Sequence, residues 1–221
     1  MIMKRSYEPE LMDDFSIQDE RIDTALKELK VINYYLGGVS TTKSALNYFI
    51  DSANEMLSVV DIGSATSDNL LAAKIFFPTL KIISIDKSFR SLKIFPNSTI
   101  KINSDAFNIP IKDENCDVVH LSLFLHHFNE AEIKLLMDEC LRICRKGIII
   151  NDLQRSYLAL LGIKILTVLF SKSKLVKNDA PLSVKRGFKK NELVKLLIES
   201  RVNSYIIRWK WAFRWMVVIK K

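Results

Sequence analysis

Apolar residues occur along this chain in short runs separated by longer amphipathic segments. Five runs have the length of buried strands, and each ends in small or polar residues. They span residues 57–62, 80–85, 99–104, 117–122 and 147–151. Segments of helical length connect the runs. This alternation predicts a doubly wound α/β fold, in which helices cover both faces of a parallel sheet.

The remaining segments extend this pattern at both ends. Helices are predicted near 19–31 and 41–54, before the first strand, and near 190–199. Two closing strands, 203–209 and 213–219, are indicated by aromatic and β-branched residues. We expect the helical segment that follows the fifth strand to be a cap inserted over the sheet.

The composition agrees with one folded unit. Of the 221 residues, 48% are hydrophobic, which can supply a substantial core. We predict a single domain, 1–221, made of N-terminal helices in 1–56, a core in 57–154, the cap in 155–190 and a closing helix and strands in 191–221.

The cysteines and the N-terminal segment bear on location. Cys116, Cys140 and Cys144 form no CxxC pair, so they favour neither a disulfide framework nor a zinc site, and they are typical of a reducing compartment. We expect Cys140 and Cys144 to lie in a helix core. Residues 1–9 contain no long apolar stretch of the secretory kind, so we expect a cytoplasmic protein.

Positive charge is concentrated in the C-terminal third. The net charge is +8, and residues 155–221 contain 16 Lys and Arg against 3 Asp and Glu, whereas residues 1–154 contain 17 against 22. Two interpretations stay open. The basic region either faces a nucleic acid or a membrane surface, or it carries ordinary solvated lysines.

The end of the first run carries the most informative motif. Asp61, Gly63, Ala65 and Ser67 form a turn of small residues around an acid, and Asp86 closes the second run. An acid about 20 residues beyond such a turn is typical of ribose recognition, because a carboxylate accepts hydrogen bonds from both ribose hydroxyls. The alternative is an ordinary buried strand and turn.

The same residues limit which nucleotide fits. A dinucleotide site has glycine at three positions and binds a pyrophosphate, which Asp61 would repel. An ammonium group would be attracted instead, and S-adenosylmethionine combines an amino-acid ammonium with an adenosine. The set Asp61, Gly63 and Asp86 resembles the class I S-adenosylmethionine-dependent methyltransferases. Ala65 departs from the family pattern, since its Cβ disfavours a left-handed backbone and would weaken cofactor binding.

Later segments extend the resemblance in family order. Residues 100–110 resemble the segment whose acid meets the adenine amino group, and 115–122 resemble the fourth strand, whose end lies beside the methyl group. The resemblance implies a Rossmann-like seven-stranded methyltransferase fold with N-terminal helices and a helical cap after strand 5. It implies S-adenosylmethionine as cofactor, bound by Asp61, Gly63, Ser64, Asp86, Lys87, Asp105, Ala106 and Leu121.

Three strings are similar to a narrower group. Residues 123–128, 150–156 and 180–188 resemble the small methyltransferases found with type III polyketide synthases. This resemblance implies a lipophilic acceptor such as an alkylpyrone, an alkylresorcinol or a derived quinone.

Two histidines follow the fourth strand and are candidates for catalysis. The imidazole of His126 or His127, with an ordinary pKa of about 6.5, can accept a phenol proton at neutral pH. We favour His127, and the alternative for either is a hydrogen-bonded structural histidine. His120 falls within the strand and is expected to be buried.

Substrate contacts are expected from Phe124, Asp152 and Arg155. The last two follow the fifth strand and are expected to face the same cleft. They either orient an acceptor hydroxyl or pair with each other and cap the next helix.

The apolar segment 156–170 is too short, and too interrupted by Gly162 and Lys164, to span a bilayer. It is either a half-buried core helix or an element that lines a lipophilic pocket or lies on a membrane. Its place after the fifth strand, and the basic tract that follows it, favour a cover for a lipophilic acceptor with peripheral contact to the inner membrane surface.

These observations predict O-methylation of a polyketide-type phenol or pyrone. The alternatives are C-methylation of a benzoquinol, an RNA methyltransferase that stacks bases on Trp209, Trp211 or Trp215, and an inactive cofactor-binding scaffold. We expect no bound metal and no nucleic-acid partner, and the oligomeric state stays open.

Overall fold

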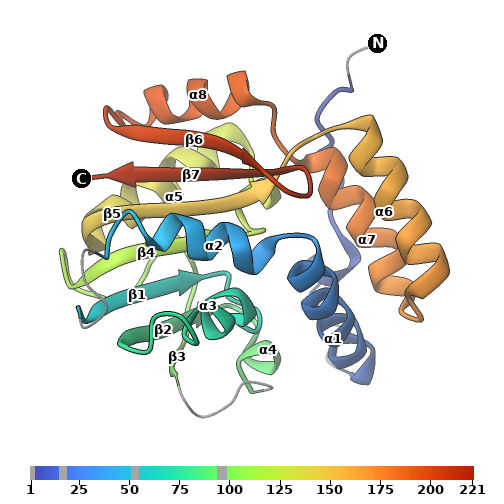
Figure 1. The fold of residues 1–221 in the computed structure, drawn as a ribbon, viewed down its shortest axis with the longest axis horizontal. Helices are drawn as coiled ribbons and strands as arrows, with labels where there is room; N and C mark the ends of the chain where they lie inside the picture. Colours follow the sequence, from blue (N-terminus) through green and yellow to red (C-terminus); the bar gives the residue numbers. More distant parts are fainter. Residues whose placement is uncertain (1–2, 15–18, 51–54, 94–98) are drawn as a thin grey trace.

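A seven-stranded sheet forms the centre of the protein (Figure 1). The computed structural model describes residues 3–14, 19–50, 55–93 and 99–221. In spatial order the strands are β3 (Ile100–Asn103), β2 (Leu80–Asp86), β1 (Leu57–Ile62), β4 (Cys116–Ser122), β5 (Cys144–Leu153), β7 (Arg214–Lys220) and β6 (Tyr205–Lys210). The first five strands of the chain run parallel, and β7 is antiparallel to both of its neighbours. The predicted Rossmann-like, seven-stranded α/β fold is confirmed.

Helices cover both faces of this sheet. They are α1 (Glu20–Tyr35), α2 (Gly38–Leu46), α3 (Asp68–Ala73), α4 (Phe89–Lys93), α5 (Glu130–Ile143), α6 (Tyr157–Phe170), α7 (Lys174–Arg186) and α8 (Lys190–Glu199), with the 3-10 turns η1 (Leu11–Asp13) and η2 (Leu125–His127). α5 and α8 pack on one face, and α2 and α3 pack on the other.

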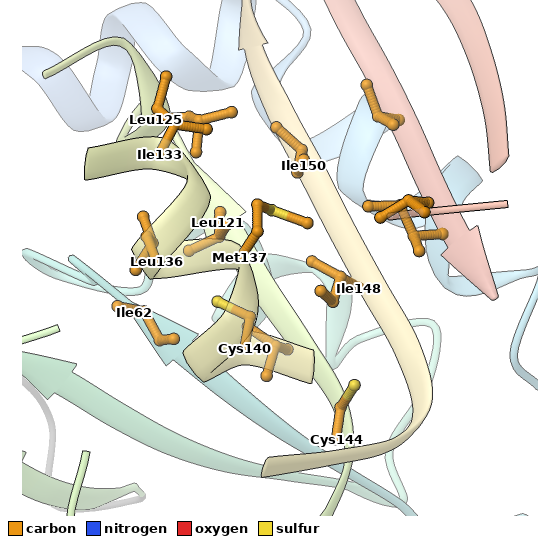
Figure 2. Close-up of a cluster of buried hydrophobic side chains, with 14 of the residues drawn as sticks. Ile62, Leu121, Leu125, Ile133, Leu136, Met137, Cys140, Cys144, Ile148 and Ile150 are labelled. Carbon is orange, nitrogen blue, oxygen red and sulfur yellow. The ribbon is translucent and has the colours of Figure 1, made fainter. Parts of the chain in front are cut away.

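Successive side chains of β5 point to opposite faces of the sheet, so they pack in two separate core clusters. Ile148 and Ile150 pack in the cluster that includes α5, and Figure 2 shows them facing Met137 of that helix. Ile149, between them, packs with α2 on the opposite face. Both faces of a central parallel strand are buried, so its sequence is a continuous apolar run rather than an alternating one.

Some predicted boundaries were wrong. β5 begins at Cys144 rather than at 147, because Cys144 pairs with Cys116 of β4. Cys144 is therefore a buried strand residue, whereas Cys140 lies in the buried face of α5 as expected. α2 ends at Leu46, short of the predicted helix 41–54, whose last four residues lie outside the described residues.

Three further helices gather beyond the carboxyl ends of the parallel strands. α1, α6 and α7 share an apolar cluster of their own, and Figure 1 shows them together at one end of the sheet. α6 and α7 form the predicted helical cap. Within the described segments no helix has the length and hydrophobicity needed to cross a membrane.

Arg214 connects this helical region to the sheet. Its side chain is fully buried at the start of β7 and donates to Leu36 O at 2.7 Å, Asn33 Oδ1 at 2.9 Å and Asn151 Oδ1 at 3.1 Å. Burial lowers the pKa of Arg214 to about 10, so the guanidinium still carries its charge at neutral pH. The end of α1 is therefore fixed to β5 through one charged side chain.

We predict that Arg214→Leu lowers the free energy of unfolding by about 3 kcal/mol, because the buried Asn151 Oδ1 and two partly buried acceptors lose their donor. Urea denaturation monitored by circular dichroism measures this change. Arg208→Leu, at an exposed position on β6, is the control and should change stability by less than about 0.5 kcal/mol. Equal effects of the two substitutions would contradict this role for Arg214.

Candidate active site

A cavity of about 710 Å³ lies where the carboxyl ends of β1, β2 and β4 meet the helices α1, α6 and α7. The strand order reverses between β1 and β4, and open α/β sheets bind ligands in the crevice at such a switch point. Its volume lies within the roughly 300–1,000 Å³ typical of small-molecule sites. Ten of the predicted site residues line this one cavity: Asp61, Gly63, Ser64, Asp86, Lys87, Asp105, Ala106, Phe124, His126 and His127.

The turn after β1 has the backbone of a ligand-binding loop. Gly63 has φ +62°, and a Cβ at this position would lie 2.0 Å from Cδ2 of Phe124, so only glycine fits. Ala65 and Ser67 also adopt left-handed backbone, with φ of 41° and 43°. Ala65 therefore adopts the left-handed backbone that its Cβ disfavours. In this conformation its amide donates a hydrogen bond to Asp86.

Asp86 ends β2 and supports this turn. Its Oδ2 accepts from the amide of Ala65 at 2.7 Å, and its Oδ1 accepts from the amide of Ser88 at 2.7 Å. Burial raises the pKa of Asp86, and these two amide bonds oppose the rise. A carboxylate has about four acceptor positions, so capacity for further donors remains.

Asp105 and Lys87 lie on the rim of the cavity. Lys87 Nζ is 3.1 Å from Asp105 Oδ2, and both side chains are largely exposed. The amide of Phe107 donates to Asp105 Oδ1 at 3.0 Å. This backbone hydrogen bond, with the neighbouring Lys87, lowers the pKa of Asp105 against the smaller effect of burial, so it is ionised at neutral pH.

Asp61 belongs to a buried chain of polar groups. Its Oδ1 lies 2.7 Å from Nδ1 of His120 on β4, and the other ring nitrogen lies 3.0 Å from Thr42 Oγ1 on α2. His120 is fully buried, as expected, and it also lines the cavity. This neighbour of Asp61 was not foreseen in the sequence.

His126 is held by a buried carboxylate. Its Nδ1 lies 2.6 Å from Asp152 Oδ1, and its amide donates to Asp152 Oδ2 at 3.2 Å. Nε2 lies 3.5 Å from Glu10 Oε1, too far for a strong hydrogen bond. Burial by itself would lower the pKa of His126, but Asp152 and Glu10 outweigh it and raise the pKa to about 9. His126 is therefore an imidazolium at neutral pH and cannot accept a proton there.

His127 has a different environment. Its Nδ1 lies 2.9 Å from Asp13 Oδ1, and its side chain is 22% exposed in the cavity wall. Burial would raise the pKa of Asp13, but the hydrogen bond to His127 and the charge of Arg186 hold it well below its usual range. Because an ionised carboxylate only accepts, we assign a proton to Nδ1, so Nε2 is the nitrogen that can exchange a proton with a ligand.

Glu10 and Asp13 were not expected in the site from the sequence. Both lie at η1, more than 100 residues from the histidines they contact, so no local pattern connects them. Arg186 of α7 also donates to the backbone carbonyls of His126, at 3.2 Å, and His127, at 2.8 Å. The turn η2 is thus fixed by the N-terminal segment, by α7 and by β5.

Three predicted site residues lie outside the cavity. Leu121 is fully buried and packs against α5, as Figure 2 shows, because side chains alternate along β4. Asp152 faces His126 instead of the cavity. Arg155 donates to Gly187 O at 2.5 Å and pairs with Glu192 at 2.5 Å. The expected place of Asp152 and Arg155 in the cleft was therefore wrong, and so was the alternative that they pair with each other.

Glu10, His126 and His127 offer potential metal-ligand atoms within 4.8 Å of one another. The two rings stack with centroids 4.4 Å apart and planes 29° apart. The expectation of no metal stays a prediction.

The comparisons with known proteins come from sequence and from structure. Residues 60–150 match a family described as "Methyltransferase domain". No curated protein matches the sequence. Human N-acetylserotonin methyltransferase, solved with S-adenosylmethionine, has a similar fold (TM-score 0.67, 16% identity), and the alignment covers 99% of this chain and 63% of that one.

Two further solved structures are similar to this chain. An O-methyltransferase family protein from Burkholderia thailandensis has a TM-score of 0.67 at 11% identity, over 98% of this chain and 65% of that one. An S-adenosylmethionine-dependent methyltransferase from Aquifex aeolicus has a TM-score of 0.57 at 14% identity, over 80% and 88%. The chain therefore spans less than two thirds of the human and Burkholderia proteins. At these identities the likeness shows the fold.

We predict that the free energy of unfolding falls as the pH rises from about 6.5 to 9. The folded-state pKa of His126 is raised to about 9, so its stabilising contribution is complete below the unfolded-state pKa of about 6.5 and is lost as the pH rises through 9. The slope from one proton is at most about 1.4 kcal/mol per pH unit. Urea denaturation at a series of pH values measures it.

His126→Gln is the matched variant, and its unfolding free energy should be lower but should lose this pH dependence. A wild-type stability that is flat or rising across the same pH window would show that His126 is not held as an imidazolium.

Proposed function

We propose that this chain, an S-adenosylmethionine-dependent methyltransferase, transfers the methyl group to an oxygen of a lipophilic small molecule, such as a polyketide-type alkylpyrone, alkylresorcinol or related phenol. One observation carries the proposal. A single cavity joins the strand-end carboxylates, the imidazole of His127, and an apolar wall from α1 and α6.

The residues at the strand ends suit S-adenosylmethionine. Gly63 lets the turn adopt its left-handed backbone against the Phe124 ring, and the Ser64 hydroxyl is buried without a hydrogen-bond partner in the described part of the chain. Asp86 retains acceptor capacity for the ribose hydroxyls, Asp105 is ionised beside the expected adenine position, and Asp61 presents negative charge toward an ammonium. We assign cofactor binding to these side chains, with Lys87 and the Ala106 backbone beside them.

S-adenosylmethionine supplies an activated methyl group on a sulfonium, so the protein has two tasks. It aligns the acceptor and takes its proton. His127 suits the second task, because Asp13 fixes the ring and stabilises the imidazolium that forms on proton transfer. His126 is a positioning residue in this proposal. Its charge is already balanced by Asp152 and Glu10, and it lies against the ring of His127.

The apolar wall supports a lipophilic acceptor. It is formed by side chains of α1 and α6, among them Leu26, Leu29, Ile163 and Leu166. Phe124 and Phe128 extend it toward His127, with Phe124 6.4 Å from the imidazole between ring centroids. An aromatic head placed near His127 would leave its alkyl chain among these side chains. Two of the structures with this fold carry O-methyltransferase or N-acetylserotonin methyltransferase in their names, which agrees with a small acceptor.

The test is methylation of a series of alkylresorcinols and alkylpyrones of increasing chain length, with a deuterated methyl donor and detection by mass spectrometry. We expect an O-methylated product and kcat/KM that rises with chain length. His127→Gln should lower kcat by roughly 10²- to 10⁴-fold, since it removes the general base. Asp13→Asn should also lower kcat. Its matched control is Asp113→Asn, at an exposed position, which should leave kcat unchanged.

Nuclear magnetic resonance of the product distinguishes oxygen from carbon as the methyl acceptor. A carbon-bound methyl group would replace the O-methylation proposal with C-methylation of a quinol in the same cleft. No product from any member of the series, in protein that binds the cofactor, would overturn the proposed acceptor class.

A further inference from the structure

The helix α6 presents apolar side chains on both of its sides. Its inward side chains, including Ala159 and Ile163, are buried against α1 and α7. Its outward side is an exposed stripe at helical spacing, made of Tyr157, Leu158, Leu161, Ile165, Val168 and Leu169. Each of these side chains is at least half exposed, and Figure 1 shows α6 on the outside of the molecule. A soluble helix normally turns polar residues outward.

Lysines border this outward stripe. Lys164 lies within α6 at the edge of the stripe, and Lys172, Lys174 and Lys177 follow the end of the helix. All four are exposed, and none forms an ion pair with any residue that the structure describes. The sequence has no acidic residue from 155 to 178, and the carboxylate that reaches this turn from α1, Glu28, accepts from the Ser171 hydroxyl and from the amides of Lys172 and Ser173.

We infer that the outward stripe of α6, with these four lysines, is a docking surface for an anionic lipid bilayer. A helix with a broad apolar face, bordered by lysines and too short to span, lies in the plane of a membrane interface. The apolar side chains enter the acyl boundary, and the lysine ammonium groups remain at the level of the anionic headgroups.

The positive charge beside the stripe favours an anionic bilayer as its partner over a second copy of the chain. In a two-fold symmetric contact the same patch meets itself, so the lysines of each copy would lie against segment 155–178 of the other copy, which contains no acidic residue to pair with them. An anionic surface supplies the opposite charge.

The stripe also adjoins the cavity. Leu158 and Gly162 are exposed and line the cavity wall, so its rim lies at the docking surface. A lipophilic acceptor dissolved in the bilayer would therefore reach the cavity without crossing water. This second part rests on the proposed function, whereas the docking itself does not.

Co-sedimentation of the purified protein with vesicles tests the docking, with phosphatidylcholine alone and with added phosphatidylglycerol. We expect binding to the anionic vesicles only, weakened by salt. The triple variant Lys172→Gln, Lys174→Gln, Lys177→Gln should lose roughly 100-fold in partition coefficient, at about fivefold for each lysine.

Leu161→Glu with Ile165→Glu should also abolish vesicle binding, because neither charge can enter the acyl boundary. Its matched control is Met56→Glu with Ile75→Glu, two exposed apolar positions far from α6 in sequence, which should bind as the wild type does. Circular dichroism melting curves establish that the variants fold. Calorimetric titration with S-adenosylmethionine measures ligand binding in the cavity at the strand ends, independently of vesicle binding.

Absence of binding to anionic vesicles, equal binding to neutral ones, or retention of binding by both the triple lysine variant and the Leu161→Glu, Ile165→Glu variant would overturn the inference. So would sedimentation velocity showing a dimer that the Leu161→Glu, Ile165→Glu variant dissociates, because a second copy would then cover the stripe. Vesicle binding needs neither cofactor nor acceptor, so its failure is distinct from a failure of methyl transfer.

Discussion

The buried pair of Asp152 and His126 is the interaction on which the site depends. It connects the end of β5 to η2, and the raised pKa of His126 keeps both partners charged at neutral pH. Removing either partner of a buried charged pair costs about 3–5 kcal/mol, because the other charge stays buried without compensation. With Arg186 on the carbonyls of η2, this pair fixes the position of His127.

Two parts of the chain meet at the cavity and contribute different chemistry. The parallel strands end side by side, so their polar terminal residues converge at one edge, as the topology requires. The N-terminal segment and the cap contribute what the strands lack, namely the carboxylate of Asp13 and the apolar wall of α6. In the proposed function the sheet supports cofactor binding, and the added helices determine which acceptor fits.

Local sequence patterns predicted the strands and their polar ends, because a buried parallel strand is a continuous apolar run and its end faces the crevice. They did not predict that Glu10 and Asp13 meet the histidines, since contacts over more than 100 residues leave no local periodicity. Asp152 follows the same strand-end pattern, but its side chain points toward η2 rather than into the crevice. The error at Leu121 was avoidable, because alternation along β4 turns it away from its neighbour His120.

The central claim is that the cavity at the strand ends binds S-adenosylmethionine through Asp86. Isothermal titration of S-adenosylmethionine and S-adenosylhomocysteine into the wild type, Asp86→Ala and the exposed Asp138→Ala tests it most directly. We predict micromolar dissociation constants for the wild type and Asp138→Ala, and loss of binding in Asp86→Ala. No binding heat with either ligand in the folded wild type, or unchanged affinity in Asp86→Ala, would contradict the claim.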